Sequence, residues 1–289
     1  MTGRLNADEV ARLLAEDGTD CDVTTAALGL EGAVGVLRFA PRGAITLAGV
    51  EAAVDVLTAC GARACALRPS GAAVGRGETI LEAAGSAPAL HRGWKVAVTL
   101  VEIFSGVATA TRAMVDAAAA GDPRVRVAAT RKTVPGARRL SQFAVMAGGG
   151  LIHRRDLSNP VLAFAQHRVF RPESARALLM RLRQAAPRKT IGVEADTCAF
   201  AVAALEAGFD LVQLDKMPFS EVNAIARIKA RCAPHAVLAA AGGLTADNAT
   251  DYARAGADVL VTSWPYTARP ADIAATMSVD DGAGARAPA

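Results

Sequence analysis

The sequence predicts an α/β protein in which a small α+β domain is followed by a barrel of parallel strands and helices. After Asp122-Pro123, short apolar runs rich in β-branched residues alternate with helical segments. The later runs begin about 20 to 25 residues apart, which is the period of a strand–helix unit. Each run is apolar throughout, as expected of parallel strands that are buried on both faces.

A doubly wound open sheet is the alternative to the barrel. That fold often carries a GxGxxG phosphate loop after its first strand. No such loop follows the first apolar run here. The sequence therefore favours the barrel.

The first third of the chain predicts the α+β domain. Asn6 followed by Glu9 is the pattern of a capping box and predicts a helix over 7–16. A long helix is expected from about 89 to 119, with Ser105-Gly106 as a candidate kink. The other predicted elements here are strands over 34–39 and 64–68 and a helix over 49–59.

The remaining two thirds supply the strands and helices of the barrel. The predicted strands are 125–129, a run near Val145, 161–165, 191–194, 211–214, 237–240 and 259–261. The predicted helices are 174–186, 197–207, 220–232 and 245–255.

Composition limits the class of protein. The chain has 289 residues, of which 52% are hydrophobic and 21% charged, and this balance argues against disorder. The N-terminus lacks the apolar core of a signal peptide, and the apolar stretch 96–107 is too short to span a bilayer. Five cysteines, without a CxxC pair, are typical of a reducing compartment. We expect a cytoplasmic protein with no membrane partner.

Positive charge is concentrated in one part of the chain. Residues 124–189 contain 15 Lys and Arg but only two acids, a net charge of +13 against +4 for the whole chain. Such a block suggests an anionic partner. Nucleic-acid binding would favour interleaved aromatic residues for stacking, and only three phenylalanines lie here. A small polyanion is the better match, and no nucleic-acid partner is expected.

Polar residues and glycines follow the predicted strands, and in α/β barrels the active site lies at those strand ends. In chain order they are Thr130-Arg131-Lys132, then Arg138-Arg139, His153-Arg154, Gln166-His167, Glu194, Asp215, Gly242-Gly243 and Thr262-Ser263-Trp264.

This set has a chemical interpretation. Arg and Lys bind phosphate or carboxylate groups. A glycine pair before a helix exposes backbone N–H groups to a phosphate. Glu194 and Asp215 could hold Mg²⁺ or stabilise a sugar cation in the transition state. Together they suggest a phosphorylated sugar with a leaving group, attacked by an anionic acceptor.

Each feature also has an ordinary structural explanation. The glycines can form tight turns, His153 can be a surface or structural histidine, and Asp215 can pair with Lys216. Asp20-Cys21-Asp22 is better explained as a turn than as a metal site. The convergence of all the strand-end residues on one rim favours the functional interpretation.

Several motifs resemble the quinolinate phosphoribosyltransferase family. They are FSGVATATR (104–112), TRKTVPGARRL (130–140), AGGGLIHR (147–154), VEAD (193–196), LVQLD (211–215), AAGGLTADNATDYA (240–253) and GADVL (256–260). Gly93-Trp94-Lys95-Val96 and Thr262-Ser263-Trp264-Pro265 are similar to the ModD-type branch, whose genes lie beside those of molybdate transporters.

The resemblance implies an N-terminal α/β sandwich, expected over 1–106, and an open, incomplete α/β barrel of type II phosphoribosyltransferases, expected over 107–269. Residues 270–289 are expected to return to the sandwich. The implied reaction joins phosphoribosyl pyrophosphate to quinolinate and gives nicotinate mononucleotide, CO₂ and pyrophosphate. The implied assembly is a homodimer with shared active sites, or a hexamer of such dimers, and the implied cofactor is Mg²⁺.

The resemblance also implies roles for particular residues. Glu194, Asp215 and Lys132 would be catalytic, and Glu194 and Asp215 would hold the metal. The acceptor would be bound by Arg131, Arg154, Lys132, His153 and, from the neighbouring protomer, Lys95, with Thr130 shaping the loop and Arg138 as a further ligand. The phosphoribosyl group would contact Glu194, Asp215, Ala241, Gly242, Gly243, Thr262, Ser263 and Trp264.

Four departures from the family pattern stand out, two of them at the acceptor end. Phe164 stands where the family has a lysine, and Lys95 stands where it has an arginine. Ala241 replaces a serine and Trp264 a small residue. These changes leave open a different acceptor linked to molybdate metabolism. A non-catalytic anion sensor and an RNA-associated basic protein are the rival classes, and the two carboxylates disfavour the sensor.

Overall fold

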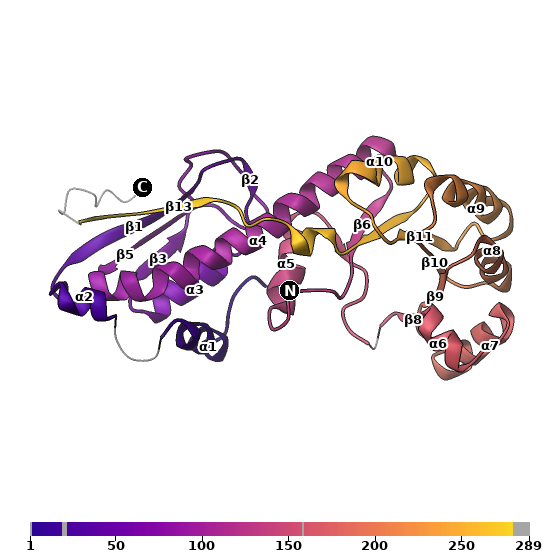
Figure 1. The fold of residues 1–289 in the computed structure, drawn as a ribbon, viewed down its shortest axis with the longest axis horizontal. Coiled ribbons are helices and arrows are strands. Elements are labelled where there is room, and N and C mark those ends of the chain that lie inside the picture. Colours follow the sequence, from indigo (N-terminus) through magenta and orange to yellow (C-terminus); the bar gives the residue numbers. More distant parts are fainter. Residues whose placement is uncertain (1, 19–21, 158, 280–289) are drawn as a thin grey trace. The chain divides into compact units, whose positions relative to one another are not determined.

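The computed structural model describes residues 2–18, 22–157 and 159–279 (Figure 1). Its contacts divide the chain into two units. The first contains the residues through Thr109, Gly136–Gly148 and those from Ala268 on, and the second contains Ala110–Pro135 and Gly149–Thr267. Residues 136–148 thus group with the first unit, although 107–269 was expected to be one continuous domain. Asp20, Cys21 and residues 280–289 lie outside the described residues.

The first unit is built on an antiparallel sheet with the order β13-β1-β5-β3. Its strands are β13 (Ile273–Val279), β1 (Val34–Pro41), β5 (Leu81–Ser86) and β3 (Arg63–Ala66). A two-stranded sheet pairs β2 (Ile45–Thr46) with β4 (Ala73–Val74). The last strand therefore returns to pair with the first, and Phe39 lies opposite Ala275.

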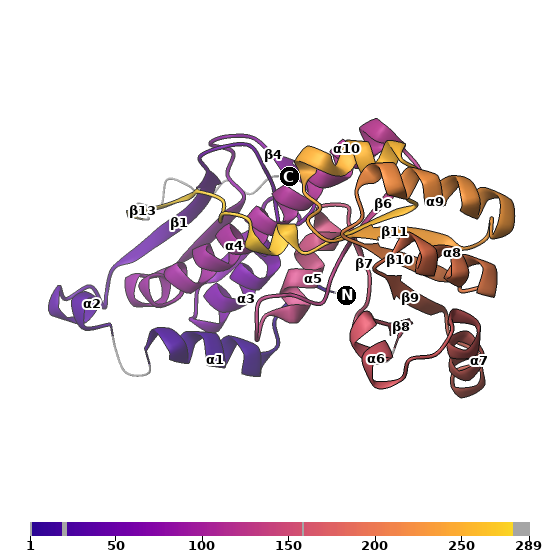
Figure 2. The ribbon, with the colours of Figure 1, turned by 45° about the vertical axis from the view of Figure 1, so that its right-hand side comes forward.

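Helices complete this unit and form a sandwich with the sheet. They are α1 (Ala7–Asp17), α2 (Val23–Ala27), α3 (Val50–Ala59), the first part of α4 (Ala87–Gly121) and α5 (Arg138–Ala147). The capping box predicted for α1 is present, with Asn6 and Glu9 each accepting the other's backbone N–H. Figures 1 and 2 show α3 and α4 along one face of the sheet.

Helix α4 continues without a break through Ser105-Gly106, where a kink was a candidate. The glycine has a packing reason instead. A Cβ added at Gly106 would lie 2.4 Å from the backbone oxygen of Arg269. Ser105 also packs closely, since its Oγ accepts from Ala48 N at 3.0 Å. The dipeptide thus lets the segment near Arg269 lie directly on the helix.

The second unit is a curled sheet of seven parallel strands with the order β7-β6-β12-β11-β10-β9-β8. The strands are β6 (Arg126–Ala129), β7 (Leu151–Ile152), β8 (Val161–Ala163), β9 (Ile191–Ala195), β10 (Leu211–Asp215), β11 (Val237–Ala241) and β12 (Val259–Thr262). Neighbouring strands follow the chain order, as in a barrel. However, β7 and β8 form the two edges of the sheet and do not pair with each other, so the barrel is not closed. The structure therefore confirms an incomplete α/β barrel.

Helices cover the outer side of this sheet (Figure 2). They are α6 (Ala165–Phe170), α7 (Ala175–Ala185), α8 (Cys198–Ala207), α9 (Phe219–Cys232) and α10 (Ala246–Arg254), with a short 3₁₀ turn, η1 (Trp264–Thr267), after β12. Ser174 and Thr197 cap α7 and α8 with their hydroxyl groups. The apolar faces pack into one core that includes Ile191, Leu205 and Leu260.

Two aspartates fix the N-terminal ends of the parallel strands. Asp210 accepts from Ile191 N at 2.7 Å and pairs with Arg183. Asp258 accepts from Leu238 N at 2.7 Å and from the Lys229 ammonium at 2.6 Å. Each carboxylate joins two neighbouring strands, which leaves the opposite ends of the sheet for function.

One predicted strand is wrong. The run near Val145 belongs to α5, which includes the predicted strand-end residues Arg138 and Arg139 in its first turn. Leu140, Ala144 and Val145 recur at helical spacing and are buried, so one face of the helix packs inward. Gly148 then ends the helix.

Helix α4 is also long and apolar enough, by length and composition alone, to cross a membrane. The apolar stretch 96–107 is only the central part of this helix. However, 56% of the most apolar window of α4 is buried inside the structure, as in a core helix of a soluble fold.

Candidate functional site

A cavity of about 520 Å³ lies at the carboxyl ends of the strands in the second unit. Of the residues predicted for the site, those that line it are Thr130, Arg131, Lys132, His153, Arg154, Phe164, Glu194, Asp215, Ala241, Gly242, Gly243, Thr262, Ser263 and Trp264. They come from all seven strand ends, so the parallel topology alone gathers residues more than 130 positions apart.

Lys95 and Arg138 do not line this cavity. Both are exposed residues of the first unit. The Lys95 ammonium lies 4.1 Å from the centre of the Trp94 ring, a cation–π contact between adjacent residues of α4. The predicted roles of Lys95, as a donation from a neighbouring protomer, and of Arg138 stay predictions.

One end of the cavity is cationic. Arg154 is buried, its Nη2 donates to Leu157 O at 2.8 Å, and its Nε has no hydrogen-bond partner in the structure. The Nε of Arg131 is likewise buried without a partner. Burial, followed by the charge of Arg131, lowers the pKa of Arg154. Two guanidinium groups that repel each other and hold unused donors form a suitable site for carboxylate or phosphate oxygens.

His153 lies beside these arginines and is neutral near pH 7. Burial, with a smaller effect of the Arg154 charge, lowers its pKa to about 4. Its Nε2 is buried and unpartnered. The backbone is fixed, because His153 N donates to Ala129 O at 3.1 Å. The imidazole therefore offers a hydrogen bond without adding charge.

The cavity also contains two carboxylates, which come from the neighbouring strands β9 and β10. Glu194 is buried on β9 and Asp215 ends the neighbouring strand β10. Burial raises the pKa of Glu194, and the negative charge of Asp215 adds to the increase. Gln213 opposes it, since its Nε2 donates to Glu194 Oε2 at 2.8 Å. In the described part of the chain neither carboxylate forms an ion pair.

This carboxylate pair fits a divalent cation. Mg²⁺ is usually held by one or two carboxylates together with substrate phosphates and water. Two adjacent carboxylates without a cationic partner, and a buried unpartnered Gln213 Oε1, supply oxygen ligands. The described residues contain no group of three or more His, Cys, Asp or Glu that could hold a metal ion, so protein ligands alone would not complete the coordination shell.

A glycine turn lies beside Asp215. Gly242 and Gly243 follow β11 with φ of 90° and 73°. A Cβ at Gly242 would lie 2.5 Å from Lys216 Cγ and 3.1 Å from Asp215 Oδ1. Asn248 Nδ2 donates to Gly243 O at 3.0 Å and ties the turn to the start of α10. Gly242 therefore brings bare backbone against the end of β10, whereas a Cβ at Gly243 would meet nothing within 4 Å.

Thr262 organises the wall rather than offering a free hydroxyl. Its Oγ1 donates to Leu244 O at 2.7 Å and accepts from Trp264 N at 3.0 Å. The loops after β11 and β12 are joined in this way. Trp264 packs partly against the core, so one of its sides is fixed while another faces the cavity.

Sequence reasoning missed three polar residues of the cavity: Gln213, Lys216 and Thr245. Gln213 lies within a strand, where only the parallel register reveals which side chains face the site. Lys216 has a φ of 56°, and no other described residue except glycine has a positive φ. Nothing in its sequence context signals that conformation, which costs about 1 kcal/mol or more in a lysine.

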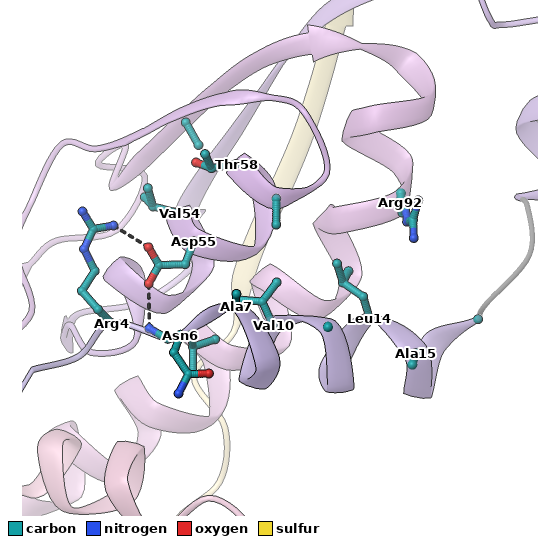
Figure 3. Close-up of a pocket in the computed structure, with 15 residues that line it drawn as sticks. Arg4, Asn6, Ala7, Val10, Leu14, Ala15, Val54, Asp55, Thr58 and Arg92 are labelled. Atoms are coloured by element: carbon teal, nitrogen blue, oxygen red, sulfur yellow. Dashed lines mark hydrogen bonds and ion pairs between the residues drawn. The ribbon is translucent and has the colours of Figure 1, made fainter.

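A second cavity, of about 850 Å³, lies in the first unit between α1 and α3 (Figure 3). None of the predicted site residues lines it. Two of its three charged residues pair with each other, because Arg4 Nη1 lies 2.6 Å from Asp55 Oδ1, and Leu5 N also donates to Asp55 Oδ2; Arg92 is the third. What remains is mostly the aliphatic surface of residues such as Val10 and Leu14. This cavity lacks the chemistry of the strand-end site.

The fold and the site define a class: an α/β-barrel protein that presents two carboxylates beside anion-binding groups. Residues 107–276 match the quinolinate phosphoribosyl transferase C-terminal domain and residues 22–105 match the N-terminal domain. The chain belongs to the quinolinate phosphoribosyl transferase family.

Relatives from two branches match most of the chain. One relative is a protein of Rhodobacter capsulatus that is named pyrophosphorylase ModD. It is 44% identical over 84% of this chain and 94% of its own length. Nicotinate-nucleotide pyrophosphorylase (carboxylating) of Mycobacterium leprae is 33% identical over 92% of this chain and 95% of its own. The crystal structure of NadC from Streptococcus pyogenes has a TM-score of 0.86 at 25% identity, covering 95% of this chain and 96% of the other.

Proposed function

We propose that this protein transfers the phosphoribosyl group of phosphoribosyl pyrophosphate to an anionic aromatic acceptor, with quinolinate as the default. The observation that carries the proposal is the content of one cavity: the adjacent carboxylates Glu194 and Asp215 share it with the basic residues after β6 and β7 and with the Gly242-Gly243 turn. Such a set suits a donor with a phosphate and a sugar, together with an anionic acceptor. Family membership supports the same reaction class.

The chain's own residues have separate tasks in this reaction. Arg131, Arg154 and Lys132 bind the acceptor's carboxylates and hold its ring nitrogen toward C1 of the ribose. As the bond from C1 to pyrophosphate breaks, its electron pair leaves with the pyrophosphate and positive charge grows on the sugar. Glu194 and Asp215 stabilise that charge. Mg²⁺, when bound by these carboxylates, supplies charge neutralisation for the pyrophosphate.

With quinolinate, the transfer is followed by loss of CO₂. The new bond makes the ring nitrogen cationic, so the ring accepts the electron pair left when the carboxylate at C2 departs. A proton then replaces the carboxylate, giving nicotinate mononucleotide. We further propose that two protomers share their sites, with Lys95 of one reaching the acceptor in the other.

A different acceptor is the second candidate, and Phe164 is the observation that favours it. Its half-buried ring lines the acceptor side of the cavity and stacks on His167 with ring centres 5.7 Å apart. An apolar ring at this place suits a less charged or larger planar acceptor than a dicarboxylate. The similarity to ModD proteins supports this alternative, with an acceptor linked to molybdate metabolism.

The test is release of pyrophosphate from phosphoribosyl pyrophosphate and Mg²⁺ with quinolinate, with nicotinate, and without acceptor. Release with quinolinate, together with CO₂, supports the default acceptor. The same release should fall at least a hundredfold in Glu194→Gln and Asp215→Asn. Tight donor binding without release would direct the search to other acceptors, and release that ignores both substitutions would contradict the proposed site.

A further inference from the structure

Lys216 is a cavity residue to which the reaction above gives no task. It follows Asp215 directly and lines the same cavity. Its backbone is held in place, since Lys216 N donates to Ala241 O at 2.7 Å. Its positive φ of 56° disfavours a lysine there, whereas glycine or asparagine adopts it more readily. A costly conformation that is fixed by the surrounding backbone often marks a functional position.

The side chain of Lys216 runs along the glycine turn. Its Cγ lies 2.5 Å from where a Cβ of Gly242 would be, so the turn accommodates the lysine only because residue 242 is glycine. Among the described residues, Lys216 has neither a hydrogen-bond partner nor an ion-pair partner for its ammonium group. The adjacent Asp215 does not pair with it, so the lysine is not used to neutralise the carboxylates.

We propose that Lys216 binds the phosphate monoester of the sugar, together with the backbone of Gly242 and Gly243, and so fixes which end of the donor enters the turn. This inference rests on the proposed function for the identity of the phosphorylated sugar. The backbone N–H groups of both glycines make no hydrogen bond to another described residue. A cation placed beside free N–H donors is the usual composition of a phosphate site.

The charges of the cavity agree with this division. The arginines and Lys132 come from the loops after β6 and β7, whereas Lys216 comes from β10 and lies against the turn after β11. In the sheet order, β12 and β11 lie between the strands that supply the two cationic groups. The group after β6 and β7 is thus suited to the acceptor, and Lys216 with the glycine turn to the 5′-phosphate.

The experiment is isothermal titration calorimetry of ribose 5-phosphate, pyrophosphate and quinolinate, each with Mg²⁺. Lys216→Asn removes the charge with a residue that tolerates positive φ. We expect the affinity for ribose 5-phosphate to fall about ten- to a hundredfold, as for loss of a charged hydrogen bond, while the other two ligands change less than twofold. Lys216→Arg should recover most of the affinity, and Arg176→Ala, which removes one exposed charge from α7, should leave it unchanged.

The melting temperature serves as the control for correct folding. It should stay equal or rise in Lys216→Asn, because asparagine relieves the backbone strain. Unchanged ribose 5-phosphate affinity in Lys216→Asn would overturn the inference, and so would a loss confined to pyrophosphate, or a wild type that binds no ribose 5-phosphate. If binding depends on Lys216 but no acceptor yields pyrophosphate release, the inference stands and the proposed transfer fails. If transfer occurs with Lys216 irrelevant to binding, the reverse holds.

Discussion

Gln213 and Glu194 face each other across the parallel pair β9–β10, and Gln213 Nε2 donates to Glu194 Oε2 at 2.8 Å. Both residues are buried. The amide of one strand therefore keeps the carboxylate of its neighbour oriented toward the cavity. The hydrogen bond also favours the ionised form of Glu194, against the burial that raises its pKa.

Gln213→Leu is expected to shift the acidic limb of the activity profile to higher pH. Without its donor, the Glu194 pKa rises further, so the carboxylate becomes protonated sooner as the pH falls. The unfolding free energy at neutral pH should also drop by about 1–3 kcal/mol, because a buried carboxylate loses a partner. Pyrophosphate release against pH measures the first effect and denaturant unfolding the second. Gln166→Leu, at an exposed position, is the control, and a profile identical to the wild type would contradict the assignment.

Because the pKa of His153 is lowered in the folded state, we expect the protein to lose stability in acid. The unfolded chain takes up the imidazole proton near pH 6.5, whereas the folded chain takes it up only at about 4. Between these values acidification favours the unfolded state, so the unfolding free energy falls as the pH is lowered. At about 1.4 kcal/mol per pKa unit, the contribution is at most about 3 kcal/mol.

Urea unfolding between pH 7 and 4 measures this effect as the difference between the wild type and His153→Asn. The variant should lose less stability over that range. His235→Asn, which removes an exposed histidine, should follow the wild type. Parallel curves for the wild type and His153→Asn would show that the imidazole is not kept neutral by burial.

We expect the residue at position 164 to determine how strongly the cavity binds a dicarboxylate acceptor. Phe164→Lys adds a cation to the acceptor side of the cavity and should strengthen quinolinate binding about tenfold, as for one charge-assisted contact. Phe164→Leu keeps the site apolar and should not. Titration of quinolinate into both variants makes the comparison. A lysine variant no tighter than the leucine variant would place the carboxylates of the acceptor elsewhere.

Gly106 tests the packing of α4. Gly106→Ala places a methyl group 2.4 Å from Arg269 O, so the backbone must shift. We expect a loss of about 1–3 kcal/mol in unfolding free energy, although alanine is the better helix former. Gly43→Ala is the matched control, because a Cβ there meets nothing within 4 Å. Thermal unfolding of both variants measures the difference in stability. Equal stabilities would contradict the close contact between residue 106 and Arg269.

The sequence predicted most of the second unit because its signals are local. Apolar runs marked the strands, and residues after them, such as Glu194 and Asp215, marked the cavity, since parallel topology brings strand ends together. Three features could not be predicted from local signals. The return of the chain's end to the first unit was expected only from the family resemblance, because β13 pairs with β1 across more than 230 residues. The run near Val145 is too short for its period to distinguish a helix from a strand. The conformation of Lys216 depends on neighbouring strands and not on its own sequence.

Binding of phosphoribosyl pyrophosphate is the most direct test of the central claim that this cavity is a phosphoribosyl donor site. Titration calorimetry should show Mg²⁺-dependent binding to the wild type and to the surface control Arg176→Ala. The affinity should fall at least tenfold in Asp215→Asn, because the charge that faces the metal and sugar is removed. Absence of donor binding in the wild type, or equal affinity in Asp215→Asn, would contradict the account.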